Sequence, residues 1–133
     1  MVRVVLDTNV LVSALICDGK PRRLVLRLLE SHTVILSNQI LAELADVLSR
    51  NKFCIKDSQV DSFLSSLVKT GKMVPYTPRF RVVSEDPDDD VVLNVAYNGK
   101  ADYIVTGDNH LLALNQFKNT RIVTVSQMLK MLT

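Results

Sequence analysis

Acidic side chains stand at four places along the chain where they could act together in chemistry. They are, in chain order, Asp7, Glu43, the adjacent Asp89 and Asp90, and Asp108. Carboxylates that converge in a poorly hydrated pocket raise one another's pKa values, and a divalent cation relieves that repulsion. These residue types therefore indicate a catalytic metal centre built from oxygen ligands.

The chemistry of such a centre follows from its donor atoms. Carboxylate oxygens without thiolate or imidazole partners suit Mg²⁺ or Mn²⁺, which prefer octahedral oxygen ligands and retain water. Such an ion lowers the pKa of a bound water, and it holds a scissile phosphate for in-line attack. One ion or two would serve, and the sequence leaves the number open.

Two of the acids follow apolar runs that predict buried parallel strands. Residues 2–6 end at Asp7, and residues 103–106 come shortly before Asp108. Because open parallel sheets bind ligands beyond the carboxyl ends of their strands, both side chains should point into one crevice. Asp7 could equally well be a simple helix N-cap.

Glu43 lies within a helical pattern over residues 38–48, with Ser37 as the expected N-cap. It falls roughly 40° outside the apolar stripe of that helix, so its carboxylate can reach the edge of a cleft. Asp46 falls further away and should face water. An ordinary boundary glutamate remains the alternative for Glu43.

The acidic run at residues 86–90 predicts a helix start. Asp86 caps the helix, and the acids after Pro87 favour the positive end of its dipole. Capping needs only one or two of them. Asp89 shares a helix face with buried residues further along and should point inward, whereas Asp90 should point more sideways and could replace or assist it.

The remaining patterns predict the rest of the fold. Strands are expected at 33–36 and 122–125, helices at 22–30, 58–70, 88–98 and from residue 126, and a surface connection with one edge strand between Gly71 and Pro87. Strands that alternate with helices indicate a three-layer α/β/α sandwich with a central parallel sheet. A chain of 133 residues, 47% of them hydrophobic, suits a single domain spanning residues 1–133.

Composition narrows the choice of function. The net charge of +2 does not indicate nucleic acid by itself, although clustered cations could form an approach for phosphates or be ordinary solvated helix faces. The chain has no glycine-rich phosphate loop, nucleophile elbow or C-x-x-C motif. His32 and His110 are isolated and should lie at the surface, while Cys17 and Cys54 should be small buried hydrophobes.

The apolar runs also bear on location. None approaches the roughly 20 residues that a membrane span requires. The beginning of the chain is too soon interrupted by charge to serve as a signal peptide. We therefore expect a cytoplasmic protein that does not contact the membrane.

Four blocks of the sequence resemble the signature blocks of PIN domains, in the same order. They cover residues 4–11, 40–44, 89–96 and 101–108. The resemblance implies an α/β/α sandwich and Mg²⁺- or Mn²⁺-dependent cleavage of RNA. The acidic quartet of the family falls on Asp7, Glu43, Asp89 and Asp108, with the third position open between Asp89 and Asp90. Asn9 and Thr106 match polar residues that orient ligands or waters.

Many small PIN proteins are toxins of toxin-antitoxin pairs, and the chain resembles the VapC type. The resemblance implies an RNA substrate, a homodimer and a cognate antitoxin protein. The alternatives are a catalytically silent PIN-like RNA-binding or scaffold module and a DNA-directed nuclease of similar fold. A phosphatase of the haloacid dehalogenase type fits less well, because it needs a second acid where Asn9 stands.

Overall fold

The computed structural model describes residues 1–50, 55–77, 80 and 87–132. In the helix that begins at residue 87, side chains are described from residue 90 onward. Its elements are β1 (Arg3–Leu6), α1 (Thr8–Ile16), α2 (Lys20–Ser31), β2 (Thr33–Leu36), α3 (Asn38–Leu48), α4 (Asp57–Thr70), β3 (Lys72–Met73), α5 (Pro87–Asn98), β4 (Tyr103–Val105), α6 (Asn109–Leu114), β5 (Gln116–Phe117), β6 (Thr120–Val123) and α7 (Val125–Leu132).

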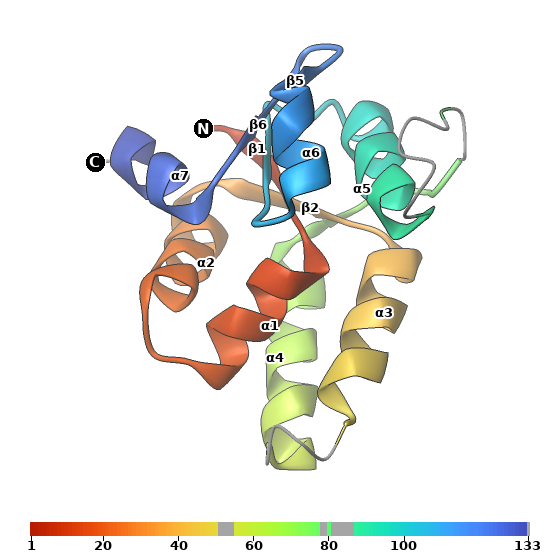
Figure 1. Cartoon of the computed structure of the whole chain (residues 1–133). Helices are drawn as coiled ribbons and strands as arrows, with labels where there is room; N and C mark the ends of the chain where they lie inside the picture. Colours follow the sequence, from red (N-terminus) through yellow and green to blue (C-terminus); the bar gives the residue numbers. More distant parts are fainter. Residues whose placement is uncertain (51–54, 78–79, 81–86, 133) are drawn as a thin grey trace.

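The strands form one six-stranded sheet in the order β3-β2-β1-β4-β6-β5. The first five strands of that order run parallel to their neighbours, and β5 pairs antiparallel with β6. Helices flank both faces, with α2 and α7 on one side and α5 on the other (Figure 1). The predicted α/β/α sandwich is confirmed, with a short antiparallel hairpin at one edge that the sequence patterns did not predict.

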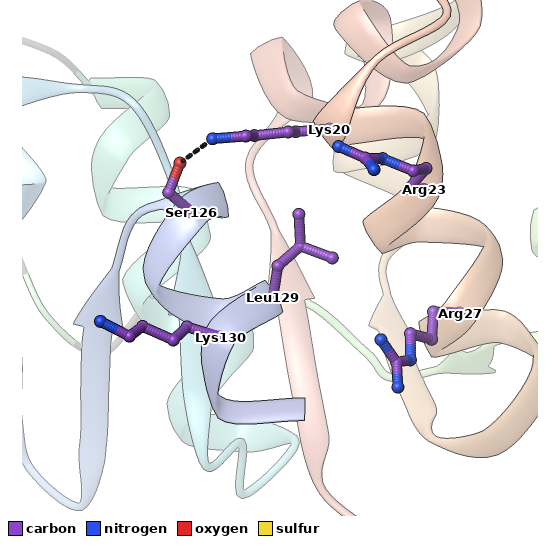
Figure 2. Close-up of a pocket in the computed structure, with 6 residues that line it drawn as sticks. All are labelled: Lys20, Arg23, Arg27, Ser126, Leu129 and Lys130. Atoms are coloured by element: carbon purple, nitrogen blue, oxygen red, sulfur yellow. Dashed lines mark hydrogen bonds between the residues drawn. The ribbon is translucent and has the colours of Figure 1, made fainter. Parts of the chain in front are cut away.

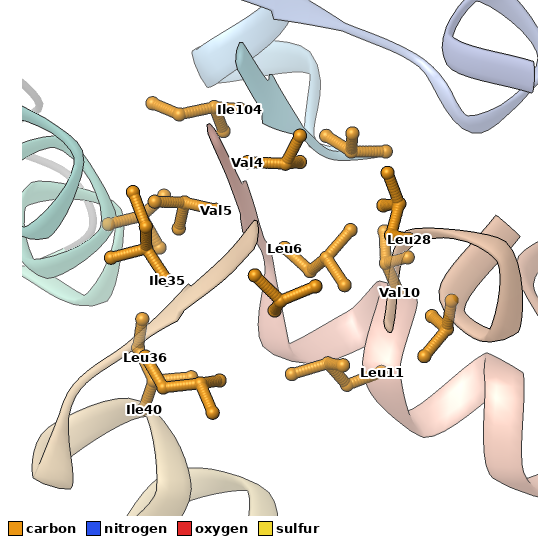
Figure 3. Packing of buried hydrophobic residues seen from close by; sticks show 14 of the residues in the cluster. Val4, Val5, Leu6, Val10, Leu11, Leu28, Ile35, Leu36, Ile40 and Ile104 are labelled. Carbon is orange, nitrogen blue, oxygen red and sulfur yellow. The ribbon is translucent and has the colours of Figure 1, made fainter. Parts of the chain in front are cut away.

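The central strands β1 and β2 are buried along most of their length. Val4, Val5 and Leu6 are fully buried, and so are Val34 and Ile35 beside them. Figure 3 shows Val4, Val5, Leu6 and Ile35 packing from both faces of the sheet against the helices. A strand buried on both faces requires an almost unbroken apolar run, which is why the sequence predicted these strands well.

Several predicted boundaries are confirmed. The strand at 33–36 and the helix at 38–48 occur as expected, and the Ser37 hydroxyl accepts a 3.2 Å hydrogen bond from the Ile40 N–H as the N-cap. The helix expected at 22–30 begins earlier, at Lys20, and the last strand ends before residue 125 because α7 starts there. The edge strand expected after Gly71 is β3.

Two helices were missed. In α1 the residues at five of nine positions are buried, so the helix lacks the polar face that makes helical periodicity visible. Helix α6 spans only six residues, fewer than two turns.

The expectation for the cysteines is wrong for Cys17, which is exposed at the carboxyl end of α1. Helix α1 buries five of its nine residues, but its last residue, Ile16, and Cys17 after it lie in solvent. Cys54 and the expected cap Asp86 lie outside the described residues.

No helix in the described part of the chain is long and apolar enough to cross a membrane.

Candidate active site

Asp7 stands between the end of β1 and the start of α1. Its backbone N–H donates to the Val105 carbonyl of β4 at 3.0 Å, and its own carbonyl accepts from Val10 and Leu11 in the first turn of α1. The residue therefore occupies the N-cap position, yet its carboxylate forms no cap hydrogen bond. That carboxylate accepts instead from Thr106 at 2.7 Å. The Asp7 carboxylate is therefore oriented by Thr106 as well as by its place at the start of α1.

Thr106 joins the two acids that follow β1 and β4. Its fully buried hydroxyl donates to Asp7 Oδ2 and accepts a 3.0 Å hydrogen bond from the Asp108 N–H. One hydroxyl thus fixes the Asp7 carboxylate and the backbone of Asp108 in the same place. The two aspartates meet at the carboxyl edge of the sheet, as the strand pattern predicted.

Burial raises the pKa of Asp7 above its ordinary value. Its side chain lies in a poorly hydrated position, with only 8% of the residue exposed, so the charged form is disfavoured. The Thr106 hydroxyl and the nearby amides of Thr8 and Asn9 lower the pKa, whereas the negative charge of Asp108 raises it further. Asp7 is therefore an acid whose charge calls for a compensating cation.

Asp108 is the more exposed of the two acids, with 24% of its side chain accessible. It caps α6, where its Oδ1 accepts a 2.7 Å hydrogen bond from the His110 N–H. The imidazole Nδ1 of His110 lies 3.7 Å from the same oxygen. We expected His110 to be isolated, and the spacing of two residues after an N-cap acid was the signal that could have linked them.

Glu43 is half-buried on α3, as its place beside the apolar stripe predicted. The buried face of the helix carries Ile40 and Leu44, while Asp46 points to solvent and pairs with Arg50 at 3.5 Å. Helix α3 packs against α1 and α5. Glu43 therefore lies on a helix that contacts both α1, which begins after Asp7, and α5, which begins near Asp90.

The acids at the start of α5 lie beside α3. The two helices begin next to one another in Figure 1 and are in contact. Asp90 is buried, 8% exposed, although we expected it to point sideways, and its carbonyl accepts a 2.7 Å hydrogen bond from Asn94 Nδ2. The side chain of Asp89 lies outside the described part, so the choice between Asp89 and Asp90 stays a prediction.

The structure thus brings Asp7, Thr106 and Asp108 into one connected set. Among the described side chains, no three of Asp, Glu, His or Cys come close enough to share one metal ion. Asp89 is not among these side chains. Asn9 and Thr106, the two predicted ligand-orienting residues, line one cleft of about 310 Å³ at this edge.

Thr8 is a neighbour that the sequence gave no reason to single out. It is 2% exposed, and its hydroxyl finds no hydrogen-bond partner in the described part of the chain. A buried hydroxyl left in this state costs free energy of folding.

Comparison with known proteins assigns the fold and the family. The PIN domain family matches residues 3–110, a stretch that contains all four acidic positions. The chain belongs to the PIN-domain family. As a PIN domain it is a member of a family of nucleases, and the resemblance of the four sequence blocks is confirmed.

Two similar proteins add to this assignment. An uncharacterized protein of Methanocaldococcus jannaschii is 33% identical over 118 residues, covering 85% of this chain and 75% of that protein. The crystal structure of VapBC2 from Rickettsia felis, bound to a DNA fragment from its promoter, contains a chain that superposes with a TM-score of 0.64. That match covers 92% of this PIN domain and 98% of the other chain at 17% identity, which shows a shared fold.

Proposed function

We propose that this PIN domain is a metal-dependent endoribonuclease that hydrolyses RNA phosphodiester bonds, with residues 1–133 as one nuclease domain. The observation that carries the proposal is the Asp7 carboxylate, buried with a raised pKa beside Asp108 at the carboxyl edge of the sheet. A protein gains no stability from such a charge unless a ligand compensates it. We therefore infer that the Asp7 carboxylate occupies this buried position because it binds a ligand.

The donor set fits Mg²⁺ or Mn²⁺. Asp7 and Asp108 offer carboxylate oxygens at one place, and neither thiolate nor buried imidazole competes there among the described residues. Asp89, with Asp90 as neighbour, and Glu43 would supply the remaining ligands in the proposed site. Glu43 would act through a water that the ion retains, because Asp7, Glu43 and Asp108 do not come close enough to share one ion directly. When bound, the ion supplies Lewis acidity and a water of lowered pKa.

The chain's own residues position these groups. Thr106 holds the Asp7 carboxylate and the Asp108 backbone through one hydroxyl. Asn9 is exposed on the first turn of α1 and lines the adjoining cleft, where its amide can orient a phosphate oxygen or a water. Thr106 and Asn9 would thus determine how a phosphodiester is oriented relative to the two aspartates.

We further propose that the protein is the toxin of a toxin-antitoxin system. Its membership of the PIN-domain family and its fold similarity to a chain of VapBC2 support this setting. The proposal includes a cytoplasmic location, a homodimer and a cognate antitoxin protein that silences the nuclease. Induced expression should stop cell growth for the wild type and not for Asp7→Asn, and equal growth of the two would reject the toxin proposal.

The test of the nuclease uses purified wild type and Asp7→Asn with a labelled RNA and Mn²⁺. We expect cleavage by the wild type and a loss of at least about 100-fold in the variant, comparable to losing one preorganised electrostatic partner of a reaction. Asp46→Asn is the matched control, because Asp46 is exposed on the far side of α3. Equal cleavage by wild type and Asp7→Asn would reject the proposal.

Two further measurements separate the alternatives. A DNA oligonucleotide of the same sequence, digested in parallel, distinguishes a DNA-directed nuclease from a ribonuclease. Calorimetric titration with Mn²⁺ distinguishes an enzyme from a silent scaffold, because a scaffold has no need to bind the ion. Binding to the wild type that Asp7→Asn abolishes supports the metal site proposed above.

A further inference from the structure

A cleft of about 500 Å³ runs between α2 and α7. The two helices pack against each other, and Figure 2 shows the side chains that line the cleft. These are Lys20, Arg23, Arg27, Ser126, Leu129 and Lys130. Four of the six are cations, an excess that the net charge of +2 does not reveal.

Three of the cations form a row on α2. Lys20, Arg23 and Arg27 are spaced by three and four residues, so they share one helix face over about 10 Å. Lys20 Nζ reaches across to Ser126 Oγ at 3.4 Å, and Arg27 donates to the Leu132 carbonyl at 3.2 Å. In the described part of the chain, no carboxylate forms an ion pair with these three.

The fourth cation differs from the others. In Figure 2 the side chain of Lys130 extends away from α2. The row on α2 therefore supplies the charge that faces the cleft, and Leu129 between the helices supplies its apolar surface.

This cleft adjoins the candidate active site. Ser126 lines both the cationic cleft and the cleft that contains Asn9 and Thr106. Pro21, the residue after Lys20, also lines the second cleft. A path therefore leads from the residues in contact with the catalytic acids, past Ser126, to the cations of α2.

We propose that the cleft between α2 and α7 is a phosphate-binding track that holds the RNA strand on one side of the scissile bond. This inference rests on the proposed function, because it assigns a role to the surface beside that site. A linear row of cations matches successive phosphates, and a guanidinium binds phosphate through two parallel hydrogen bonds. An acidic peptide would also suit the charge, but it would have no need of a cleft continuous with the hydrolytic site.

The first experiment measures RNA binding without cleavage. A labelled single-stranded RNA is titrated with Asp7→Asn and with Asp7→Asn carrying Arg23→Gln, over a series of salt concentrations. Each phosphate contact on a single strand contributes about 0.7 to the slope of log affinity against log salt. We expect Arg23→Gln to lower the slope by about 0.7 and to weaken binding about fivefold at 0.1 M salt.

Arg23 is the right first target because its side chain is exposed and forms no hydrogen bond or ion pair with the described residues. Arg27→Gln should have a similar effect, and Arg27→Lys, which keeps the charge, should recover most of the binding. Arg121→Gln is the matched control. Arg121 is exposed near the amino end of β6 and does not line the cleft, so binding should not change.

The second experiment locates the track. The RNA is shortened stepwise from each end, and affinity is measured for the Asp7→Asn background with and without Arg23→Gln. On the end that lies in the cleft, removal of nucleotides should abolish the difference between the two proteins. Shortening from the other end should leave that difference intact.

The outcomes separate this inference from the proposed function. If Arg23→Gln and Arg121→Gln bind RNA alike while the wild type still cleaves RNA, the track is wrong and the ribonuclease stands. If the wild type neither binds nor cleaves RNA, the ribonuclease fails and the track fails with it. If Arg23→Gln weakens the binding of polyglutamate but not the binding of RNA, the cleft is a site for an acidic peptide and the proposal is overturned.

Discussion

The Thr106 hydroxyl donates a 2.7 Å hydrogen bond to Asp7 Oδ2 and so ties the end of β4 to the end of β1. The same oxygen accepts from the Asp108 N–H, which fixes the start of α6. A single buried hydroxyl therefore sets the geometry of two acids that are 101 residues apart in sequence, since Asp108 and Asp7 differ by that number. Its loss should affect both acids at once.

Thr106→Val is predicted to lower RNA cleavage by about 10- to 100-fold, the usual effect of removing a group that orients a metal ligand. The substitution leaves the Asp7 carboxylate without its donor, and the pKa of Asp7 should rise further. Activity should then begin at a higher pH than in the wild type. Thr106→Ser retains the hydroxyl and should restore both activity and pH profile. Similar profiles for the Val and Ser variants would contradict this role.

Thr8→Val is the matched counterpart. The Thr8 hydroxyl is buried without a partner, whereas that of Thr106 has two. Valine keeps the shape and removes the unpaired group, so the free energy of unfolding should rise by about 1 kcal/mol. Thr106→Val should instead lower it by about 1.5–3 kcal/mol, because a hydrogen bond to a charged group is lost. Urea unfolding of both variants measures the difference, and a destabilised Thr8→Val would show that its hydroxyl has a partner in solution.

The sequence predicted well those strands and helices whose burial produces a clear pattern of apolar residues. The strand at residues 33–36 is buried on both faces, and α3 has a cap at Ser37 and a clean apolar stripe. Helix α1 was missed because five of its nine residues are buried and no polar face alternates with them to give a periodic signal. The burial of Asp90 was also not predicted, since helix angle alone does not say how closely α3 approaches.

In the candidate site, too, the sequence predicted some relationships between residues and not others. The topology of parallel strands predicted that Asp7 and Asp108 would meet, because strand ends share one edge. The role of Thr106 came only from the resemblance to PIN domains, and its two hydrogen bonds appear only in the structure. The contact of His110 with Asp108 could have been predicted from the two-residue spacing after an N-cap acid, whereas the unpaired Thr8 hydroxyl depends on local geometry that no residue pattern encodes.

Asp7→Asn should change stability in a pH-dependent way when divalent ions are absent. The pKa of Asp7 is raised in the folded state, mainly by burial. Below the unfolded-state pKa the group is neutral in both states and costs nothing. As pH rises through the folded-state pKa, the wild type loses stability that the asparagine variant keeps. The variant's advantage in free energy of unfolding should therefore grow from acid to neutral pH, as measured by urea unfolding with EDTA.

Added Mn²⁺ should reverse the order of stability, so that the wild type becomes more stable than Asp7→Asn. An ion that binds only the folded state stabilises it by mass action, so the melting temperature of the wild type should rise with ion concentration. Asp7→Asn, which lacks a ligand, should respond weakly. An advantage of the variant that is flat with pH, or equal responses of both proteins to Mn²⁺, would contradict the assignment of Asp7 as a buried metal ligand.

Gly71→Ala is predicted to destabilise the fold by about 1–3 kcal/mol, as overpacking does. A Cβ at this position would lie 2.6 Å from Leu36 Cδ1 and 2.7 Å from the Leu67 carbonyl oxygen, and the latter cannot move without disturbing α4. The glycine is thus required for space at the end of the helix, since its φ of −82° suits any residue. Gly107→Ala is the control, because its Cβ would meet no atom within 4 Å. Thermal unfolding should separate the two variants clearly.

The ambiguity between Asp89 and Asp90 can be settled by a matched pair of substitutions. Asp90 is buried beside Asn94, whose side chain links the Asp90 carbonyl to the backbone of Phe80. We predict that Asp89→Asn abolishes Mn²⁺ binding and cleavage while changing the melting temperature little. Asp90→Asn should mainly alter stability, with cleavage reduced less than tenfold, because Asp90 belongs to the buried hydrogen-bond network of Asn94 and Phe80.

Calorimetric Mn²⁺ titration, RNA cleavage and thermal unfolding of both variants provide the comparison. The three measurements matter together, because a loss of cleavage alone would not distinguish a missing ligand from a displaced α5. If Asp90→Asn loses the ion while Asp89→Asn keeps it, the third acidic ligand is Asp90.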